Sequence, residues 1–214
     1  MIRSQDREII DNPNLSEQTL DLVYKDLTRT HRFLGNTRAL LTKLGRDPKP
    51  LRKVVDIGCG RGELLLEIQR KMAVETVGVE LRLPSTISPG IRIIKADAVC
   101  DPLPPCDVAL AVCVIHHLSD DSVVKLIRNV GRTSKRFVIL DLVRHPLPLL
   151  LFRFFVAPYI YWINAADGIS SIRRSYTPRE LESLVRQALD GSTGTYRHYV
   201  GWLYTRQIVD IRYL

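Results

Sequence analysis

Residues 54–63 read Val54-Val55-Asp56-Ile57-Gly58-Cys59-Gly60-Arg61-Gly62-Glu63 and predict a short buried strand, a glycine-rich turn and the start of a helix. Because glycine has no Cβ, this turn can bend sharply and let a ligand approach the backbone closely. The next apolar run, 76–79, ends at Glu80, which lies 20 residues beyond Gly60. At this spacing a nucleotide-binding βαβ unit places the carboxylate that accepts hydrogen bonds from ribose hydroxyls.

Acidic residues around the turn help to decide which kind of nucleotide cofactor it would bind. A dinucleotide fingerprint, G-x-G-x-x-G or A, would place Gly or Ala at position 63, where this chain has Glu63. A pyrophosphate would also be repelled by Asp56 and Glu63, because it needs the helix N-terminus as an anion site. The same carboxylates suit a ligand that carries an ammonium and a sulfonium, such as S-adenosylmethionine. A nicotinamide or flavin cofactor and a purely structural turn are the alternatives.

The order acidic residue, apolar residue, Gly-x-Gly-x-Gly at 56–62 resembles motif I of class I S-adenosylmethionine-dependent methyltransferases. The resemblance covers about residues 50–214. It implies a doubly wound α/β Rossmann-like fold, with a mostly parallel seven-stranded sheet and an antiparallel last strand. It also implies S-adenosylmethionine as cofactor and S-adenosylhomocysteine as product. In finer detail, residues 114–118 and 167–178 are similar to bacterial small-molecule methyltransferases of quinone biosynthesis and polyketide tailoring.

Strand and helix patterns alternate from residue 53 onward, which predicts a parallel sheet covered on both faces. We expect strands at 53–57, 75–80, 91–95, 107–113 and 136–141, then an antiparallel pair at 195–202 and 206–213. We expect helices at 62–71, 120–131 and 177–189, and a weak helix or none near 84–89. Thr177, Pro178 and Glu180 form a strong helix start.

Three regions are expected. Residues 1–50 predict an N-terminal helical extension or lid, with one helix beginning at 15–18 and a second over 37–44. Residues 51–214 predict the cofactor-binding methyltransferase domain. Within it, residues 147–176 predict an inserted substrate lid, because methyltransferases often insert one between the fifth strand and the next helix.

The composition is that of an ordinary globular domain, with 45% hydrophobic and 25% charged residues among 214. The net charge of +8 raises the question of a nucleic-acid or anionic-membrane partner. The basic residues are scattered without a run of five, which favours a solvated surface and gives no strong nucleic-acid signal. Four cysteines without C-x-x-C spacing, and no signal peptide, predict a reduced cytoplasmic protein.

The cofactor is expected at the carboxyl ends of the strands, as in other open α/β sheets. Asp56 would attract the cofactor's ammonium, directly or through water, and Glu80 would accept two bonds from the ribose. The resemblance implies that Asp97 accepts a bond from the adenine amino group; the alternative is a turn-forming role. The full expected cofactor set is Asp56, Gly58, Cys59, Gly60, Gly62, Glu80, Leu81, Asp97, Ala98 and Val114.

Candidate catalytic residues follow the fourth and fifth strands. His116 and His117 lie at the strand end that faces the transferable methyl group, and a histidine there suits removal of a hydroxyl proton. The alternative is a histidine that bonds a backbone carbonyl and shapes the pocket. We expect the two neighbours to face different ways, so that at most one touches the acceptor. Asp141 is a second candidate base or a turn cap.

No metal is expected. Methyl transfer from a sulfonium is an in-line displacement on an activated carbon, for which alignment and exclusion of water carry most of the rate. In addition, His116 and His117 with scattered carboxylates do not show the spacing of a metal-ligand set.

The segment 147–163 is unusually rich in leucine and aromatic residues. It predicts an apolar wall for a flat or lipophilic acceptor; the alternatives are an ordinary core helix, and a surface for peripheral membrane contact or a homodimer. The expected acceptor-binding residues are His117, Arg144, Phe152, Tyr159, Trp162, Arg174 and Tyr176.

These features favour methyl transfer to a small apolar or aromatic acceptor (a polyketide, phenol, quinone or lipid), at oxygen before carbon, in secondary metabolism. The alternatives are a nucleic-acid or protein methyltransferase and a non-catalytic S-adenosylmethionine-binding partner subunit. Enzymes that methylate a planar nitrogen carry an Asn/Asp-Pro-Pro-aromatic motif after the fourth strand. This chain has Val-Ile-His-His at 114–117 instead, which argues against that reaction.

Overall fold

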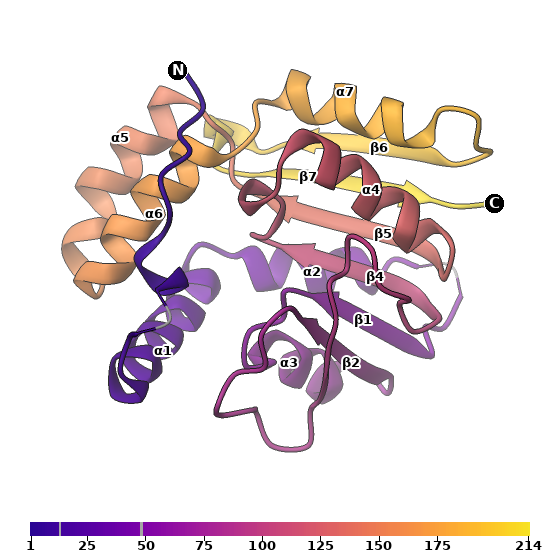
Figure 1. Cartoon of the computed structure of the whole chain (residues 1–214), viewed down its shortest axis with the longest axis horizontal. Helices are drawn as coiled ribbons and strands as arrows, with labels where there is room; N and C mark the ends of the chain where they lie inside the picture. Colours follow the sequence, from indigo (N-terminus) through magenta and orange to yellow (C-terminus); the bar gives the residue numbers. More distant parts are fainter. Residues whose placement is uncertain (13, 48) are drawn as a thin grey trace.

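A seven-stranded sheet in the order β3-β2-β1-β4-β5-β7-β6 forms the centre of the computed structural model, which describes residues 1–12, 14–47 and 49–214. The parallel strands are β1 (Lys53–Ile57), β2 (Glu75–Glu80), β3 (Arg92–Lys95), β4 (Cys106–Val112) and β5 (Ser134–Asp141). The antiparallel strand β7 (Gln207–Arg212) lies between β5 and β6 (Thr195–Val200) (Figure 1). The predicted doubly wound, Rossmann-like methyltransferase fold with an antiparallel last strand is confirmed.

Helices cover both faces of the sheet because its strands alternate apolar side chains between two cores. On one face, Val55 and Ile57 of β1 pack with α4 (Asp120–Gly131) and α7 (Pro178–Leu189). On the other, Val54 packs with α2 (Asn36–Leu44) and α3 (Glu63–Lys71). Thr177 and Glu180 form the predicted capping box that begins α7.

A second group of helices lies beyond the carboxyl ends of the parallel strands (Figure 1). It consists of the 3-10 helix η1 (Ile9–Asp11), α1 (Glu17–Phe33), α5 (Pro146–Phe155) and α6 (Trp162–Arg174). Asn164 of α6 ties the group together, because its Nδ2 donates to the Val23 carbonyl at 3.0 Å and to Asp26 Oδ2 at 2.9 Å. This end of the sheet is where ligands of open α/β folds bind.

Two regions lack a single regular helix. Residues 84–89 contain no helix, which agrees with the weaker alternative. The segment 147–163 is not one element: α5 ends at Phe155, the 3-10 helix η3 (Ala157–Tyr159) contains Pro158, and α6 starts at Trp162. Among the described residues, no helix combines the length and apolar character needed to cross a bilayer.

Candidate active site

The glycine-rich turn after β1 has the backbone shape that its sequence predicts. Gly58 has φ +68°, and a Cβ there would lie 2.5 Å from Val114 Cγ2, so only glycine fits between the turn and the end of β4. The Gly58 amide donates to the Val79 carbonyl at 2.8 Å, which joins the turn to β2. Cys59 is buried, and its sulfur fills the space above Gly78.

Two carboxylates flank this turn: Glu80 is half-buried and Asp56 is buried. Glu80, at the end of β2, accepts a hydrogen bond from the Gly60 amide at 2.5 Å through Oε1. Asp56 is 2% exposed, and its Oδ1 has no hydrogen-bond partner. Burial, and then the nearby Glu80 charge, raise the pKa of Asp56 well above its usual range, and burial raises the pKa of Glu80. The cavity beside them thus presents two carboxyl groups whose ionised forms a cationic ligand would stabilise.

Gly62, which precedes α3 and lies against Ile91, is not among the residues that line the cavity. The remaining expected cofactor residues do line it. Leu81 is exposed at its rim, whereas Ala98 is buried and Val114 half-buried. Asp97 also lines the cavity, and its Oδ1 accepts from the Val99 amide at 2.9 Å. The turn-forming role that was the alternative for Asp97 is therefore present, and an adenine contact would use its other oxygen.

His116 lies on the 3-10 helix η2 (Ile115–His117) and is clamped by Asp141 at the end of β5. The distance from His116 Nδ1 to Asp141 Oδ1 is 2.7 Å, and the His116 amide donates to Asp141 Oδ2 at 3.2 Å. The second ring nitrogen, Nε2, is buried and has no hydrogen-bond partner. Just before this helix, Cys113 has φ +55°, a backbone strain of the kind found at functional sites.

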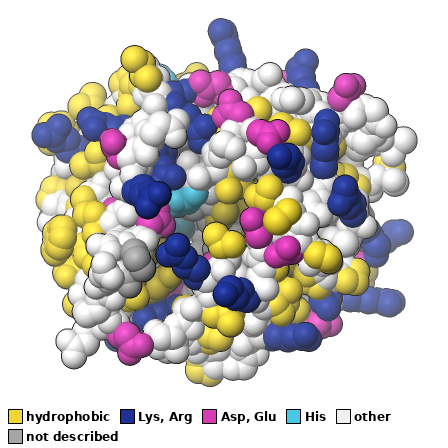
Figure 2. All heavy atoms as spheres, in the orientation of Figure 1, with side chains coloured by type: hydrophobic (Ala, Val, Ile, Leu, Met, Phe, Trp, Pro, Cys, Tyr) yellow, Lys and Arg dark blue, Asp and Glu magenta, His cyan; other side chains and the backbone are white. Residues whose placement is uncertain are grey.

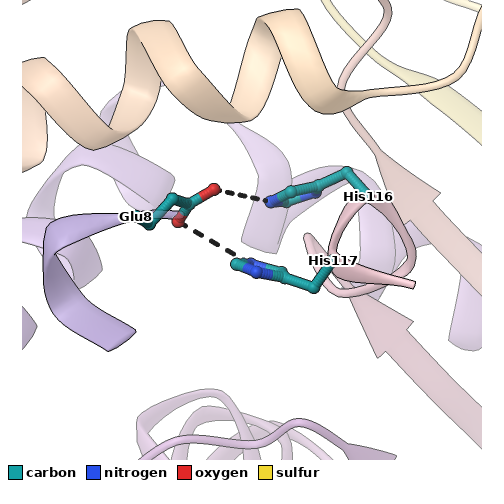
Figure 3. Close-up of side chains that lie close together, drawn as sticks. All are labelled: Glu8, His116 and His117. Atoms are coloured by element: carbon teal, nitrogen blue, oxygen red, sulfur yellow. Dashed lines mark ion pairs between the residues drawn. The ribbon is translucent and has the colours of Figure 1, made fainter. Parts of the chain in front are cut away.

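The expectation that His116 and His117 face different ways is wrong. Both rings point to Glu8, which precedes η1 in the N-terminal segment (Figure 3). Glu8 Oε1 lies 3.4 Å from His116 Nε2, and Glu8 Oε2 lies 3.7 Å from His117 Nε2. The tight 3-10 turn at 115–117 brings the rings together, with centroids 4.3 Å apart.

The two histidines differ in their electrostatic surroundings. Burial alone would lower the pKa of His116, but the carboxylates of Asp141 and Glu8 raise it to about 9. For His117, burial and the neighbouring His116 lower the pKa below its usual value. For Glu8, burial opposes ionisation, but the nearby rings of His116 and His117 lower its pKa.

Helix α6 holds the N-terminal segment over this cluster. Asp167 accepts from the backbone amides of Ile9 at 2.6 Å and Ile10 at 2.9 Å, so it binds the start of η1 with both oxygens. Ser171, one turn further along α6, donates to Glu8 Oε1 at 2.7 Å. Arg174 Nη1 lies 3.9 Å from Glu8 Oε1. The segment around Glu8 is therefore positioned by buried polar groups.

The expected acceptor residues divide into two groups. His117, Phe152 and Arg174 line the cavity, and the Phe152 ring packs against Gly168. The structure does not bring the other four there, and each has a visible physical reason. Arg144 pairs with Glu180, Tyr176 is buried and donates to the Leu118 carbonyl at 2.9 Å, and Tyr159 and Trp162 are 80% and 61% exposed.

The cavity has a volume of about 1060 Å³. It runs from the glycine-rich turn to the histidine pair, and residues of the N-terminal segment, α1 and α6 complete its wall. Figure 2 shows a hollow near the centre of this face, with acidic side chains and a histidine side chain at its edge. The volume is at the upper end for small-ligand pockets, large enough for two ligands side by side.

The sheet order, the glycine-rich turn and the acid on β2 define a class I methyltransferase architecture. The sequence profile of a family described as a methyltransferase domain matches residues 28–188, which is well over half of the chain. The chain belongs to this family, and with it to the S-adenosylmethionine-dependent methyltransferases. None of the curated proteins matches the sequence.

Solved structures of methyltransferases share the fold. The plantazolicin methyltransferase BpumL, in complex with a monoazolic desmethylPZN analog and SAH, has a TM-score of 0.69 and 13% identity, over 92% of this chain and 91% of that one. Human N-acetylserotonin methyltransferase in complex with SAM has a TM-score of 0.61 and 17% identity, and the match covers 92% of this chain and 56% of that one. The small-RNA methyltransferase HEN1 has a TM-score of 0.63 and 12% identity, and the match covers 83% of this chain and 25% of that one.

Sequence reasoning missed Glu8, Asp11 and the role of Asp167 and Ser171. Asp167 and Ser171 lay in a segment singled out for its similarity to small-molecule methyltransferases, so a signal existed without an assigned role. Glu8 gave no signal, because a single acidic residue in a polar N-terminal segment is ordinary. Only the fold brings it against residues more than a hundred positions away.

Proposed function

We propose that this methyltransferase transfers the methyl group of S-adenosylmethionine to a hydroxyl oxygen of a small apolar or aromatic acceptor. The observation that carries the proposal is the single cavity that joins the acidic glycine-rich turn to the histidine pair. When bound, S-adenosylmethionine supplies a methyl carbon that is already activated for in-line displacement. The chain's own residues then have three tasks: to bind, to align and to exclude water.

The groups at the turn fit the cofactor. The unpartnered Asp56 oxygen offers a buried carboxyl whose ionised form an ammonium group would stabilise. Glu80 is fixed by the Gly60 amide through one oxygen, so its other lone pairs can accept from ribose hydroxyls. Gly58, Cys59, Gly60, Gly62, Leu81, Asp97, Ala98 and Val114 complete the proposed cofactor site.

The opposite end of the cavity supports the acceptor assignment. Phe152, Ile160 and Ile172 give an apolar wall, and Glu8, His116, His117 and Arg174 are polar groups beside it. A mostly apolar wall with few convergent polar groups is typical of a small-molecule site. We propose that residues 1–50 and 147–176 act as the lid over the acceptor. We also propose that His116, His117 and Asp141 are the catalytic residues. The acceptor hydroxyl would lose its proton beside these three side chains.

The test is transfer of labelled methyl from S-adenosylmethionine to a panel of phenols, hydroquinones, polyketide enols and hydroxylated lipids, beside RNA and protein. We expect turnover with at least one small hydroxyl acceptor and none with the polymers. His117→Ala should lower kcat by about 100-fold or more, the usual contribution of a group that handles the acceptor proton. His145→Ala is the control, because His145 caps α5 and stacks on Tyr204.

Turnover on RNA or protein alone would contradict the proposal and favour the polymer alternative. Binding of the cofactor without turnover on any acceptor would instead favour a non-catalytic partner subunit.

We propose a cytoplasmic setting and a role in secondary metabolism, the first supported by four cysteines without a disulfide. The expected contact of residues 147–163 with a membrane or a second copy stays a prediction; its physical basis is the exposed outer face of Leu150, Phe154, Phe155, Tyr159 and Trp162.

A further inference from the structure

We propose that Glu8, His116 and His117 form a site for one divalent transition-metal ion at the acceptor end of the cavity. Each of the three side chains offers one ligand atom, and these atoms all lie within 4.8 Å of one another. Two imidazoles and one carboxylate are the protein ligands of catalytic zinc sites and of other transition-metal centres that keep open positions. Two of the three residues are buried, and Figure 3 shows all three side chains converging.

The distances fit ligands around an ion better than a hydrogen-bonded cluster. A charge-assisted hydrogen bond between nitrogen and oxygen would be about 2.7–2.9 Å long. The Glu8 oxygens lie instead 3.4 Å from His116 Nε2 and 3.7 Å from His117 Nε2. Ligand atoms at tetrahedral corners around zinc, with bonds of about 2.0–2.1 Å, are separated by about 3.3 Å.

The surroundings orient the ligands as a metal site requires. Asp141 holds His116 through Nδ1, so that Nε2, which is buried and unpartnered, faces Glu8. Such a carboxylate–histidine pair is the usual outer support of a metal-bound imidazole. Ser171 holds the Glu8 carboxylate by donating to its Oε1 at 2.7 Å. These supports come from β5 and α6, so the ligand geometry does not depend on the N-terminal segment alone.

The charge around the cluster also suits a divalent cation. The carboxylates of Glu8, Asp11 and Asp141 lie beside the histidines, with contacts of 2.7–3.8 Å. Arg174 is a cationic neighbour, with its Nη1 3.9 Å from both Glu8 and Asp11. Three carboxylates against one guanidinium leave two negative charges when the histidines are neutral ligands, and a divalent ion balances them.

The expectation that no metal is needed rested on the chemistry of methyl transfer and on sequence spacing, and the spacing did not include Glu8. The role of the ion, though not its binding, rests on the proposed O-methylation. With both imidazoles bound to the ion, they would act on the acceptor through the ion and not as the base. The acceptor hydroxyl would bind at an open position of the ion and release its proton to water, because coordination lowers its pKa. The resulting oxygen anion would form the bond to the methyl carbon as the carbon–sulfur bond breaks, leaving S-adenosylhomocysteine.

The test is titration of the chelator-treated full chain with Co²⁺, followed by visible absorption, and with Zn²⁺, followed by calorimetry. We expect one equivalent to bind without a thiolate-to-cobalt charge-transfer band. Glu8→Gln and His117→Gln should each weaken binding by more than about 100-fold, and Asp141→Asn by about 10–100-fold, because it removes an outer support. His198→Gln is the matched control: His198 is half-buried on β6 and contacts Gln207 at 3.1 Å.

Several results would overturn the proposal: no saturable binding by the wild type, a thiolate band, or unchanged affinity in Glu8→Gln. X-ray absorption of the zinc-loaded wild type gives a second answer that does not depend on a variant's folding. It should show imidazole and oxygen ligands, and a sulfur ligand would contradict the site. Titration of the metal-free chain with S-adenosylhomocysteine is a separate measurement; failure there would count against the cofactor assignment and not against the metal.

Discussion

The two ends of the cavity are built in different ways. The cofactor end is local, because the glycine-rich turn and Glu80 come from β1, β2 and the connection between them. Hydrogen bonds from the Gly58 and Gly60 amides join the turn to β2. The acceptor end is assembled from the N-terminal segment, η2, β5 and α6, with Glu8 at its centre. Changes at the first end should therefore affect cofactor binding alone, whereas changes at the second should affect the acceptor and leave the cofactor in place.

The largest expected effect is at the cofactor end. Glu80→Ala removes the acceptor of the Gly60 amide and the proposed ribose contacts, and each charged hydrogen bond contributes about 1.5–3 kcal/mol. We expect the Kd for S-adenosylhomocysteine to rise by about 100-fold or more, measured by calorimetry. Glu75→Ala, at the exposed start of the same strand, is the control and should leave the Kd for S-adenosylhomocysteine unchanged. Undiminished binding by Glu80→Ala would contradict the assignment of this carboxylate.

An intermediate effect is expected at the acceptor end. Phe152→Ala removes an aromatic wall of the cavity, and lost apolar contact of this size costs about 1–2 kcal/mol. The KM for the acceptor should rise by about tenfold while the Kd for S-adenosylhomocysteine stays the same. Phe154→Ala is matched to it, because Phe154 lies on the same helix and is 63% exposed. Equal effects of both substitutions, or a loss of cofactor binding in Phe152→Ala, would break the separation of the two ends.

The smallest effect concerns Arg144, which was expected at the acceptor and instead pairs with Glu180 at the start of α7. Burial alone would raise the pKa of Glu180, but hydrogen bonds from Arg144 and Thr177 lower it. A lowered folded-state pKa stabilises the fold above the unfolded value of about 4.3, and this contribution is lost as pH falls through the folded-state pKa.

Glu180→Gln should therefore cost about 0.5–1 kcal/mol at pH 7, a modest figure because Glu180 is half-exposed and screened. The difference from wild type should disappear as the pH falls below about 4 in thermal unfolding. Binding of S-adenosylhomocysteine and the acceptor KM should not change. A raised acceptor KM in this variant would contradict this account and support the original expectation that Arg144 binds the acceptor.

The contrast between the two ends also explains what the sequence could predict. Asp56, the three glycines and Glu80 follow from spacing within one βαβ unit, because strand, turn and helix impose their own geometry. The convergence of His116 and His117 could not be predicted, since it depends on a 3-10 turn and on Glu8. Tyr159 and Trp162 were expected at the cavity by composition, but the break between α5 and α6 leaves them exposed. The profile of an apolar segment does not tell which of its faces turns inward.

A crystal structure of the full chain with S-adenosylhomocysteine tests the central claim most directly. The account predicts density for the ribose at Glu80, for the amino acid portion along the turn at 58–62, and for the sulfur on the side of Val114 that leads to the histidine pair. Density for the ligand elsewhere, or a turn closed by its own side chains with Glu80 directed into solvent, would contradict it.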